Sequence, residues 1–326
     1  MTIGLIINPK ARTYHRSKRV RKSLDKLSIF AETEFLDDFD TLSQIVSRLA
    51  QKHCDHLVIS GGDGTIQATL THLAEGNHFQ HQPTLILLPH GTTNMTAKDA
   101  GIASLSKSDR LITAIAGHGV SDLPSHLPCE IVNRHTIRIA NPGSGTPLHG
   151  MYFGWGAVHR AVLKCQKDVH AMGFRGDLGP ALTLLGSWFS HVLGRSGSDP
   201  NRIVQGHKLC LVADGKTQVD SQQLLLSITT LEHLIAKCRP FWNQSENALK
   251  TTLIAYPVQK ALRMLIPVLY GDKHRQITEP GYNSFSARQV SFETTSDCIL
   301  DGEIVTAPEH EPLHLSLGPQ FRFLKL

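Results

Sequence analysis

The sequence contains few cysteines and no closely spaced pair of them. Its six cysteines lie at positions 54, 129, 165, 210, 238 and 298 of 326 residues. The Cys-x-x-Cys spacing of many zinc and redox sites is therefore missing. The first residues have the pattern of a core strand instead of a secretion signal, and scattered thiols suit a reducing compartment. We expect a cytoplasmic protein.

Long hydrophobic runs are also lacking. The longest, Ala181 to Leu193, is interrupted by glycine, serine and histidine, and it is shorter than the roughly 20 residues of a membrane-spanning helix. Any membrane association should therefore be peripheral. Aromatic residues make up 6% of the chain, and only Tyr14 lies among the basic residues near the N-terminus. Without such aromatics or a known nucleic-acid module, we expect no nucleic-acid partner.

Histidine is abundant, but its spacing does not indicate a metal site. The chain has 19 histidines, and the pairs His53/His56 and His310/His314 lack a third and a fourth ligand. No Ser-His-Asp or Cys-His arrangement indicates nucleophilic catalysis. The histidine of most interest is His90, because it lies in a turn described below.

Length and pattern predict two domains of an α/β plus β fold. A chain of 326 residues with 40% hydrophobic content can form two substantial cores. Residues 1–125 alternate strands and helices, which predicts a parallel sheet covered by helices on both faces. After Pro124 and Pro128 strands dominate, so residues 126–310 are expected to form a mainly antiparallel β domain. Residues 311–326 should contain a last strand that could return to the first domain.

Periodicity predicts individual elements. A helix is expected over Asp40–Lys52, and Asp214-Gly215 should join the strands His207–Ala213 and Lys216–Thr229 in a hairpin. Amphipathic helices in the second domain would pack in its core or, alternatively, line an acyl-chain groove or enter a bilayer interface. These helices are expected over 157–169, 182–193 and 258–270, and short strands over 285–293, 298–300, 303–306 and 312–317.

A Gly-Gly-Asp-Gly-Thr turn at residues 61–65 is the most informative feature. It follows the apolar strand His56–Ile59 and precedes a helix that should end at Gly76. Glycines let the backbone approach a ligand closely, and a helix N-terminus favours phosphate. Because Asp63 would repel bare phosphate, the turn implies a divalent metal. The alternative is a tight strand-to-helix turn that the aspartate caps.

Two further strand ends carry comparable turns. The apolar strand at 85–88 leads into Pro-His-Gly-Thr-Thr-Asn at 89–94, and the strand at 4–7 leads into Asn-Pro-Lys at 8–10. In an open parallel sheet the carboxyl ends of the strands form the ligand crevice. All three turns can therefore converge on one nucleotide.

Basic residues are concentrated after the first strand. The net charge is +5, and six Lys or Arg residues lie between Arg12 and Lys22. These residues could simply form a solvated helix face. In the alternative interpretation, Arg12, Arg16 or Lys18 contacts nucleotide phosphate, and the remaining basic residues lie against anionic lipid head groups. An anionic membrane surface is therefore an expected partner.

These strings together resemble the diacylglycerol kinase catalytic-domain family, which includes sphingosine, ceramide and bacterial lipid kinases. Members carry the Asn-Pro turn, Gly-Gly-Asp-Gly-Thr, Pro-x-Gly-Thr-x-Asn and a late Asp-Gly-Glu, and the order matches from Asn8 to Glu303. The resemblance implies an α/β domain of the NAD kinase/diacylglycerol kinase type before the β domain. It further implies magnesium-dependent transfer of the γ-phosphate of ATP to a hydroxyl of a membrane lipid, of the diacylglycerol or the sphingoid/ceramide type.

The resemblance also implies roles for single residues. Asp301 would be the general base, and Glu303 would support it or the metal, although Asp-Gly between strands is first of all a hairpin turn. Asp301→Asn is then expected to lower turnover and to leave stability nearly intact. Asp63 would bind the catalytic magnesium ion. The implied nucleotide-binding residues are Asn8, Pro9, Lys10, Arg12, Gly61, Gly62, Asp63, Gly64, Thr65, Gly91, Thr92 and Asn94.

The sequence departs from the family at three places. Ala11 is followed by Arg12 where many members have glycine, and Met95 stands where aspartate is frequent. In many bacterial members an acidic turn of the second domain holds a structural magnesium ion. The corresponding residues 247–250 are Asn-Ala-Leu-Lys, with Glu246 as the acid nearby. This weakens the case for a structural metal.

Other functions remain open from the sequence. They are an NAD kinase-like enzyme with a soluble substrate, an inactive nucleotide- or lipid-binding module, and a membrane-interaction protein that works through its basic helix. The presence of Asp63, Thr92, Asp301 and Glu303 favours an active lipid kinase. The sequence does not identify the lipid or the oligomeric state, for which a homodimer remains open.

Overall fold

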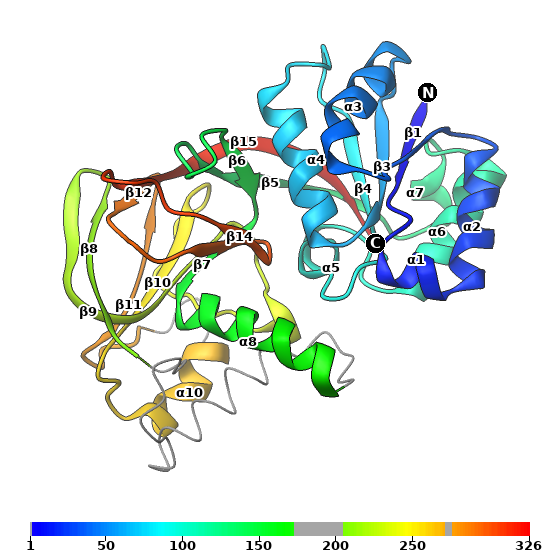
Figure 1. The fold of residues 1–326 in the computed structure, drawn as a ribbon. Helices are drawn as coiled ribbons and strands as arrows, with labels where there is room; N and C mark the ends of the chain where they lie inside the picture. The colour runs from blue at the N-terminus through cyan, green and yellow to red at the C-terminus, as the bar shows by residue number, and fades with distance from the viewer. Residues whose placement is uncertain (1, 173–204, 271–275) are drawn as a thin grey trace. The chain divides into compact units, whose positions relative to one another are not determined.

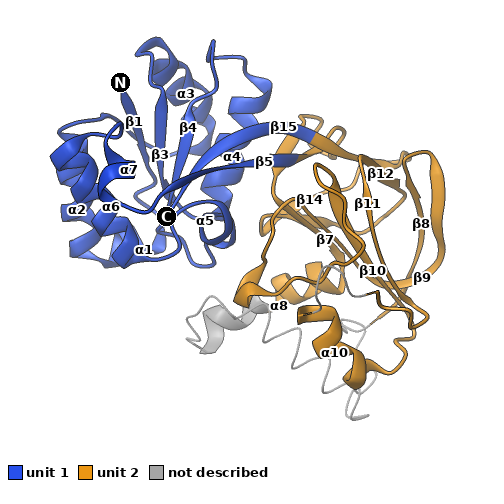
Figure 2. Ribbon diagram, turned by 180° about the vertical axis from the view of Figure 1, so that it is seen from behind, with its two compact units in different colours: residues 1–136, 318–326 blue, residues 137–317 orange. Residues whose placement is uncertain are grey.

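The computed structural model describes residues 2–172, 205–270 and 276–326, and the chain divides into two compact units (Figures 1 and 2). The first unit comprises residues 1–136 and 318–326, and the second comprises residues 137–317. Two strands, β5 (Glu130–Ile139) and β15 (Leu313–Lys325), carry the chain between the units. The first unit extends beyond residue 125 because Pro124 lies in the first turn of helix α7 (Leu123–His126) instead of in a linker.

A parallel sheet forms the centre of the first unit. Its strands are β1 (Ile3–Ile7), β2 (Glu32–Phe35), β3 (His56–Gly61) and β4 (Thr84–Pro89), in the spatial order β4-β3-β1-β2. All residues of β1, β3 and β4 are buried, as expected for parallel strands that are covered on both faces. The end of β15 adds a parallel strand beside β4, where Phe323 pairs with Leu85.

Helices of the first unit follow the predicted pattern with one exception. The helix predicted over Asp40–Lys52 is confirmed as α3, and Gly76 ends α4 as expected. The basic segment forms two helices instead of one, because Ser17 has an extended backbone and its hydroxyl accepts a hydrogen bond from Val20 N. The bounds are α1 (Arg12–Arg16), α2 (Lys18–Ser28), α3 (Leu42–Gln51), α4 (Asp63–Glu75), α5 (Met95–Ala100) and α6 (Leu105–His118).

Antiparallel strands dominate the second unit, which confirms the predicted α/β plus β fold class. The hairpin at Asp214-Gly215 is confirmed, and both of its turn residues have positive φ, 48° and 76°, as a two-residue hairpin turn requires. The bounds are β6 (Leu148–Gly150), β7 (Tyr152–Gly156), β8 (His207–Ala213), β9 (Lys216–Thr229), β10 (Leu249–Ala255), β11 (Tyr282–Ala287), β12 (Gln289–Phe292), β13 (Cys298–Leu300) and β14 (Glu303–Val305).

Two predicted strands have different bounds in the structure. The strand expected over 285–293 divides at Arg288, because β11 pairs with β10 whereas β12 pairs with β8 and β15. The strand expected over 312–317 is the beginning of the longer β15, which continues into the first unit.

Helices α8 (Ala157–Met172) and α10 (Ala261–Tyr270) interrupt the β unit. They confirm the helices predicted over 157–169 and 258–270, while the helix predicted over 182–193 lies outside the described residues. In α10, Met264 and Val268 are buried, whereas Leu262 and Ile266 are exposed. Among the residues that the structure describes, no helix combines the length and the apolar character that crossing a membrane requires.

Candidate functional site

The three turns predicted from the sequence lie at the carboxyl ends of adjacent parallel strands. Ile7 is in register with Ser60 across β1 and β3, and Gly61 is in register with Pro89 across β3 and β4. The turns after Ile7, Gly61 and Pro89 therefore begin at the same edge of the sheet. This edge is where α/β proteins of this architecture bind ligands.

Gly62 and Gly91 bring two of the turns into direct backbone contact. A Cβ atom added to Gly91 would lie 2.2 Å from Gly62 Cα, and one added to Gly62 would lie 3.1 Å from Gly91 Cα. The first distance is far below any van der Waals separation, so a side chain at position 91 cannot be accommodated without movement. Gly61 is restricted by a side chain instead, because its Cβ would lie 2.5 Å from Thr65 Cβ. The glycines thus permit a close approach of main chains.

Asn8 joins the first turn to the glycine turn. Its Nδ2 donates to Thr65 Oγ1 at 2.9 Å, and its Oδ1 accepts from Lys10 N at 2.9 Å. The Asn8 main-chain N–H donates to Ser60 O at 3.0 Å. Lys10 Nζ donates to Asp37 O at 2.6 Å. Asn8 therefore positions the turns, and the Lys10 ammonium group is engaged by the loop after β2.

Asn94 closes the third turn on itself. Its backbone is left-handed, with φ 52°, and its Oδ1 accepts from Gly91 N at 2.8 Å while its Nδ2 donates to Gly91 O at 3.1 Å. Thr13 N donates to His90 O at 2.9 Å, which connects this turn to α1. Thr92 is exposed, and Arg12, the first residue of α1, is half-buried.

Asp63 caps a helix other than its own. Its two carboxylate oxygens accept hydrogen bonds from Met95 N at 3.1 Å and Thr96 N at 3.0 Å, at the N-terminus of α5. Burial raises the pKa of Asp63, and the hydrogen bonds from Thr96 and Met95 oppose this shift. The carboxylate therefore fixes α5 against the glycine turn, a role for which short polar side chains at helix N-termini are suited.

The donor set around Asp63 restricts how a magnesium ion could be held. Within the described parts of the chain there is no group of three or more His, Cys, Asp or Glu side chains that could hold a metal ion. Each carboxylate oxygen of Asp63 already accepts one main-chain hydrogen bond, so only its remaining lone pairs could bind a metal ion. This fits an ion held mainly by phosphate oxygens and water, as is usual for magnesium, with Asp63 as a single protein ligand.

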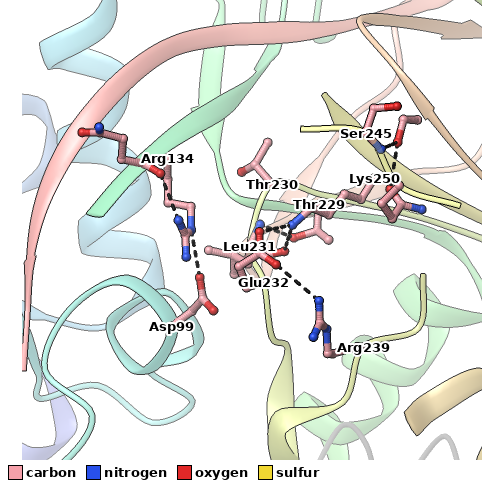
Figure 3. A network of polar contacts seen from close by, with 12 residues as sticks. Asp99, Arg134, Thr229, Thr230, Leu231, Glu232, Arg239, Ser245 and Lys250 are labelled. Carbon is pink, nitrogen blue, oxygen red and sulfur yellow. Dashed lines mark hydrogen bonds and ion pairs between the residues drawn. The ribbon is translucent and has the colours of Figure 1, made fainter. Parts of the chain in front are cut away.

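A second contact holds α5 near its C-terminal end, at Asp99. Asp99, which is buried, accepts from Arg134 Nε of β5 at 3.3 Å (Figure 3). Sequence patterns did not indicate this pair, because the two residues are far apart in the sequence and neither lies in a motif. With Asp63 it fixes the short helix that follows the Asn94 turn.

His90 is buried between two serines. Its Nδ1 lies 2.8 Å from Ser60 Oγ and its Nε2 lies 3.4 Å from Ser108 Oγ. Burial lowers the pKa of His90 to about 4, against a weak opposing effect of Asp109. The imidazole is therefore neutral at physiological pH, and its contacts connect β3, the third turn and α6. We identify it as a structural part of the turn.

In the second unit, Asp301 forms a hairpin turn between β13 and β14. Asp301 and Gly302 have φ of 52° and 95°, which confirms the turn expected from Asp-Gly. The carboxylate of Asp301 is buried and accepts from Met151 N and Tyr152 N, both at 2.9 Å. Glu303 is exposed in β14. The general-base role of Asp301 and the supporting role of Glu303 stay predictions.

The first unit is an α/β unit whose glycine-rich turns meet at the carboxyl edge of its parallel sheet. Residues 2–123 match the family model of the diacylglycerol kinase catalytic domain. This match confirms the resemblance that the motifs indicated, and it covers the three turns of the first unit.

Solved structures from Bacillus anthracis are similar in fold over nearly the full length of the chain. A structure from Bacillus anthracis str. Sterne, provisionally named a diacylglycerol kinase, is 16% identical, with a TM-score of 0.65 over 99% of this chain and 96% of that chain. A diacylglycerol kinase from the same organism is also 16% identical, with a TM-score of 0.61 over the same shares. An NAD kinase from Archaeoglobus fulgidus in complex with ATP is 10% identical, with a TM-score of 0.47 over 98% and 93%. No curated protein matches the sequence.

Proposed function

We propose that the protein is an ATP-dependent lipid kinase, which transfers the γ-phosphate of ATP to a hydroxyl of a membrane lipid of the diacylglycerol or sphingoid/ceramide type. The observation that carries the proposal is the backbone contact of Gly62 with Gly91, within a segment that matches the diacylglycerol kinase catalytic domain. Phosphoryl transfer needs positioning and charge neutralisation more than covalent chemistry. Main-chain N–H groups at a helix N-terminus supply both for phosphate.

The residues of the two units would have different tasks. The turns at Asn8, Gly61–Thr65 and Gly91–Asn94 would bind the nucleotide phosphates, and magnesium would neutralise the charge that develops on them. In the second unit, the Asp301 carboxylate would accept the hydroxyl proton of the lipid. Its two hydrogen bonds from Met151 N and Tyr152 N would fix the orientation of the acceptor oxygens.

Two surfaces support a lipid substrate at a membrane. Arg16, Lys18 and Lys22 are exposed, and cations at such positions attract anionic head groups. Two other basic residues of this segment have partners within the unit: Arg19 Nε is 2.7 Å from Asp109, and Arg21 donates to the carbonyl groups of Tyr14 and His15. In α10, Leu262, Ile266 and Tyr270 are each more than half exposed and recur every fourth residue, which gives one helix face apolar character.

A lipid-phosphorylation assay tests the proposal. Radiolabelled ATP, magnesium and the purified protein are incubated with a total lipid extract, and the products are separated by thin-layer chromatography. We expect one labelled lipid whose formation stops in Gly91→Ala. Label that appears only in water-soluble products would point to a soluble substrate of the NAD kinase type and would contradict the proposal.

A second candidate, an inactive nucleotide- or lipid-binding module, is favoured by one observation. Both candidate acids, Asp63 and Asp301, already accept two main-chain hydrogen bonds each. If they serve only the fold, the protein binds ATP but transfers no phosphate. Calorimetric titration with Mg-ATP beside the lipid assay separates the two: binding without any labelled lipid would establish the module.

A further inference from the structure

Lys250, in the strand β10, carries a buried ammonium group. Its side chain is 9% exposed, and its Nζ donates to Leu231 O at 3.0 Å and to Glu232 Oε1 at 2.6 Å (Figure 3). The ammonium group also lies 5.1 Å from the centre of the Phe241 ring. Lysine is rarely buried unless it is paired. A main-chain carbonyl, a carboxylate and an aromatic face are three groups that each attract a cation.

The resemblance to bacterial lipid kinases implies a structural magnesium ion in this region, and the residues present do not fit one. The stretch that would supply the acids reads Asn247-Ala248-Leu249-Lys250, so its last residue contributes a positive charge. Magnesium requires oxygen ligands at about 2.1 Å, and two of the oxygens in this region, Leu231 O and Glu232 Oε1, already accept hydrogen bonds from the Lys250 ammonium group. A second cation at the same oxygens would be repelled.

We propose that the Lys250 ammonium group is a built-in cation that takes the place of a bound metal ion in the second unit. It neutralises Glu232, which also lies 3.4 Å from Arg239 Nη2, and it fixes the Leu231 carbonyl group two residues beyond the end of β9. The inference concerns the metal dependence of the fold, and it does not rest on the proposed lipid substrate.

The contacts of Lys250 lead to the Asp301 turn through a short series of hydrogen bonds. Leu231 N donates to Thr229 Oγ1 at 3.1 Å, and Thr229 Oγ1 donates to Met151 O at 2.9 Å. Met151 N in turn donates to Asp301 Oδ2. A charge that fixes Leu231 therefore also restrains the main chain that holds the Asp301 carboxylate. Lys250 is in this sense a positioning residue.

Amide hydrogen exchange, followed by mass spectrometry in the absence of nucleotide, gives a local test. The segments 150–152 and 229–232 are compared with Mg²⁺ and with EDTA. In the wild type we expect the same protection in both solutions. Lys250→Met should exchange faster in both segments, because Leu231 O and Glu232 lose their cation, and Mg²⁺ should not restore protection. Lys250→Asp should also exchange faster, but Mg²⁺ should restore protection because the acid recreates a metal site.

Two further variants complete the design. Lys208→Met removes an exposed lysine of the same unit, whose side chain is 75% exposed, and should exchange like the wild type. Lys250→Arg keeps the positive charge and should keep most of the protection; it also serves if Lys250→Met does not fold. Protection that depends on Mg²⁺ in the wild type would overturn the proposal. So would wild-type protection in Lys250→Met, or a Lys250→Arg variant that is as unprotected as Lys250→Met or fails to fold.

Discussion

Two aspartates of the second unit occupy the same kind of hairpin turn, and only one is a catalytic candidate. Asp214 accepts main-chain hydrogen bonds from Arg288 and Gln289, as Asp301 does from Met151 and Tyr152. Asp214 is exposed and Asp301 is buried. A hairpin turn of this kind can thus contain a hydrogen-bonded aspartate that has no proposed catalytic role. Asp214 therefore provides a matched control for Asp301.

We predict that Asp301→Asn loses both stability and turnover. An amide can offer only one acceptor oxygen, so its NH₂ group would face Met151 N or Tyr152 N, at a cost of about 1–3 kcal/mol. Loss of a general base should lower kcat by about 10²–10⁴. The sequence-based expectation of nearly intact stability is thus revised, because the sequence does not reveal the two N–H donors.

Denaturant unfolding and kcat are measured for Asp301→Asn and for Asp214→Asn. The exposed control should lose less stability and no activity. If the folded fraction of Asp301→Asn has a near-normal kcat, Asp301 has only a structural role in the turn.

His90 should make the protein sensitive to mild acid. Its pKa is lowered by burial from 6.5 to about 4, so the unfolded chain binds a proton at a pH where the folded protein does not. The resulting stabilisation is present above pH 6.5 and is lost as the pH falls towards 4, by about 2 kcal/mol between pH 7 and pH 5. Urea unfolding at several pH values measures it.

His90→Gln should be less stable at pH 7 and should show a flatter pH dependence. His15→Gln, at an exposed position, should keep the wild-type profile. An unchanged slope in His90→Gln would assign the acid sensitivity to other groups.

At the scale of elements, the turns are held together by main-chain contact and by helix capping. Both arrangements depend on residues that are adjacent only after the sheet has formed. The sequence predicted each turn, because strand, glycine and helix follow one another directly. It could not predict that Asp63 caps α5 instead of its own helix, since that contact joins residues 32 and 33 positions apart.

Gly91→Ala should separate the two glycine turns. The added methyl group would meet Gly62 Cα, and overpacking of this kind typically costs about 1–3 kcal/mol. Gly117→Ala is the control, because a Cβ at that position of α6 meets nothing within 4 Å and alanine favours a helix by roughly 0.5–1 kcal/mol. Mg-ATP affinity, measured by calorimetry, should fall in Gly91→Ala and stay constant in Gly117→Ala. If the Mg-ATP affinity is unchanged in both variants, the two glycine turns are not part of the nucleotide site.

Asp63→Ala should weaken Mg-ATP binding and abolish phosphate transfer. It removes the acceptor for two N–H groups of α5, a loss of about 1–2 kcal/mol by comparison with other helix caps, and it displaces the adjoining Asn94 turn. Ser104→Ala removes the cap of α6, where Ser104 Oγ accepts from Lys107 N at 3.3 Å. Ser104→Ala should lower the stability of the protein without changing its affinity for Mg-ATP. Normal turnover and affinity in Asp63→Ala would leave Asp63 with a capping role alone.

At the scale of the whole molecule, the sequence was most informative about architecture. Alternation of strands and helices predicted the parallel sheet, and the succession of short strands with an Asp-Gly hairpin turn predicted the antiparallel unit. The contacts of Lys250 and Arg134 could not be predicted, because an ion pair between residues 18 or 35 positions apart leaves no periodic signal in the sequence. The two compact units have other limits than the predicted domains, since β5 and β15 each contribute residues to both units.

Membrane binding should depend on salt and on the exposed cations of α1 and α2. Each properly placed charge contributes about 1 kcal/mol at an anionic surface, so Arg16→Gln with Lys18→Gln should weaken binding to phosphatidylserine vesicles roughly 30-fold. The matched control replaces the exposed Lys208 and Lys216 of the second unit. Vesicle sedimentation at low and high salt measures the effect. If both double variants lose the same amount of vesicle binding, the net charge of the protein is enough to explain the binding. Vesicle binding that does not change with salt would contradict an electrostatic mode of binding.

The strand β15 has a consequence for the order of folding during synthesis. The first unit contains residues at both ends of the described chain, and Phe323 pairs with Leu85 of β4. Residues 1–136 leave the ribosome before residues 137–317, and the edge of β4 that pairs with β15 stays unpaired until β15 has been made. Such an edge invites pairing with other chains. The unit proposed to bind the nucleotide therefore starts to form before the second unit and is completed after it, and the open edge of β4 favours aggregation during that interval.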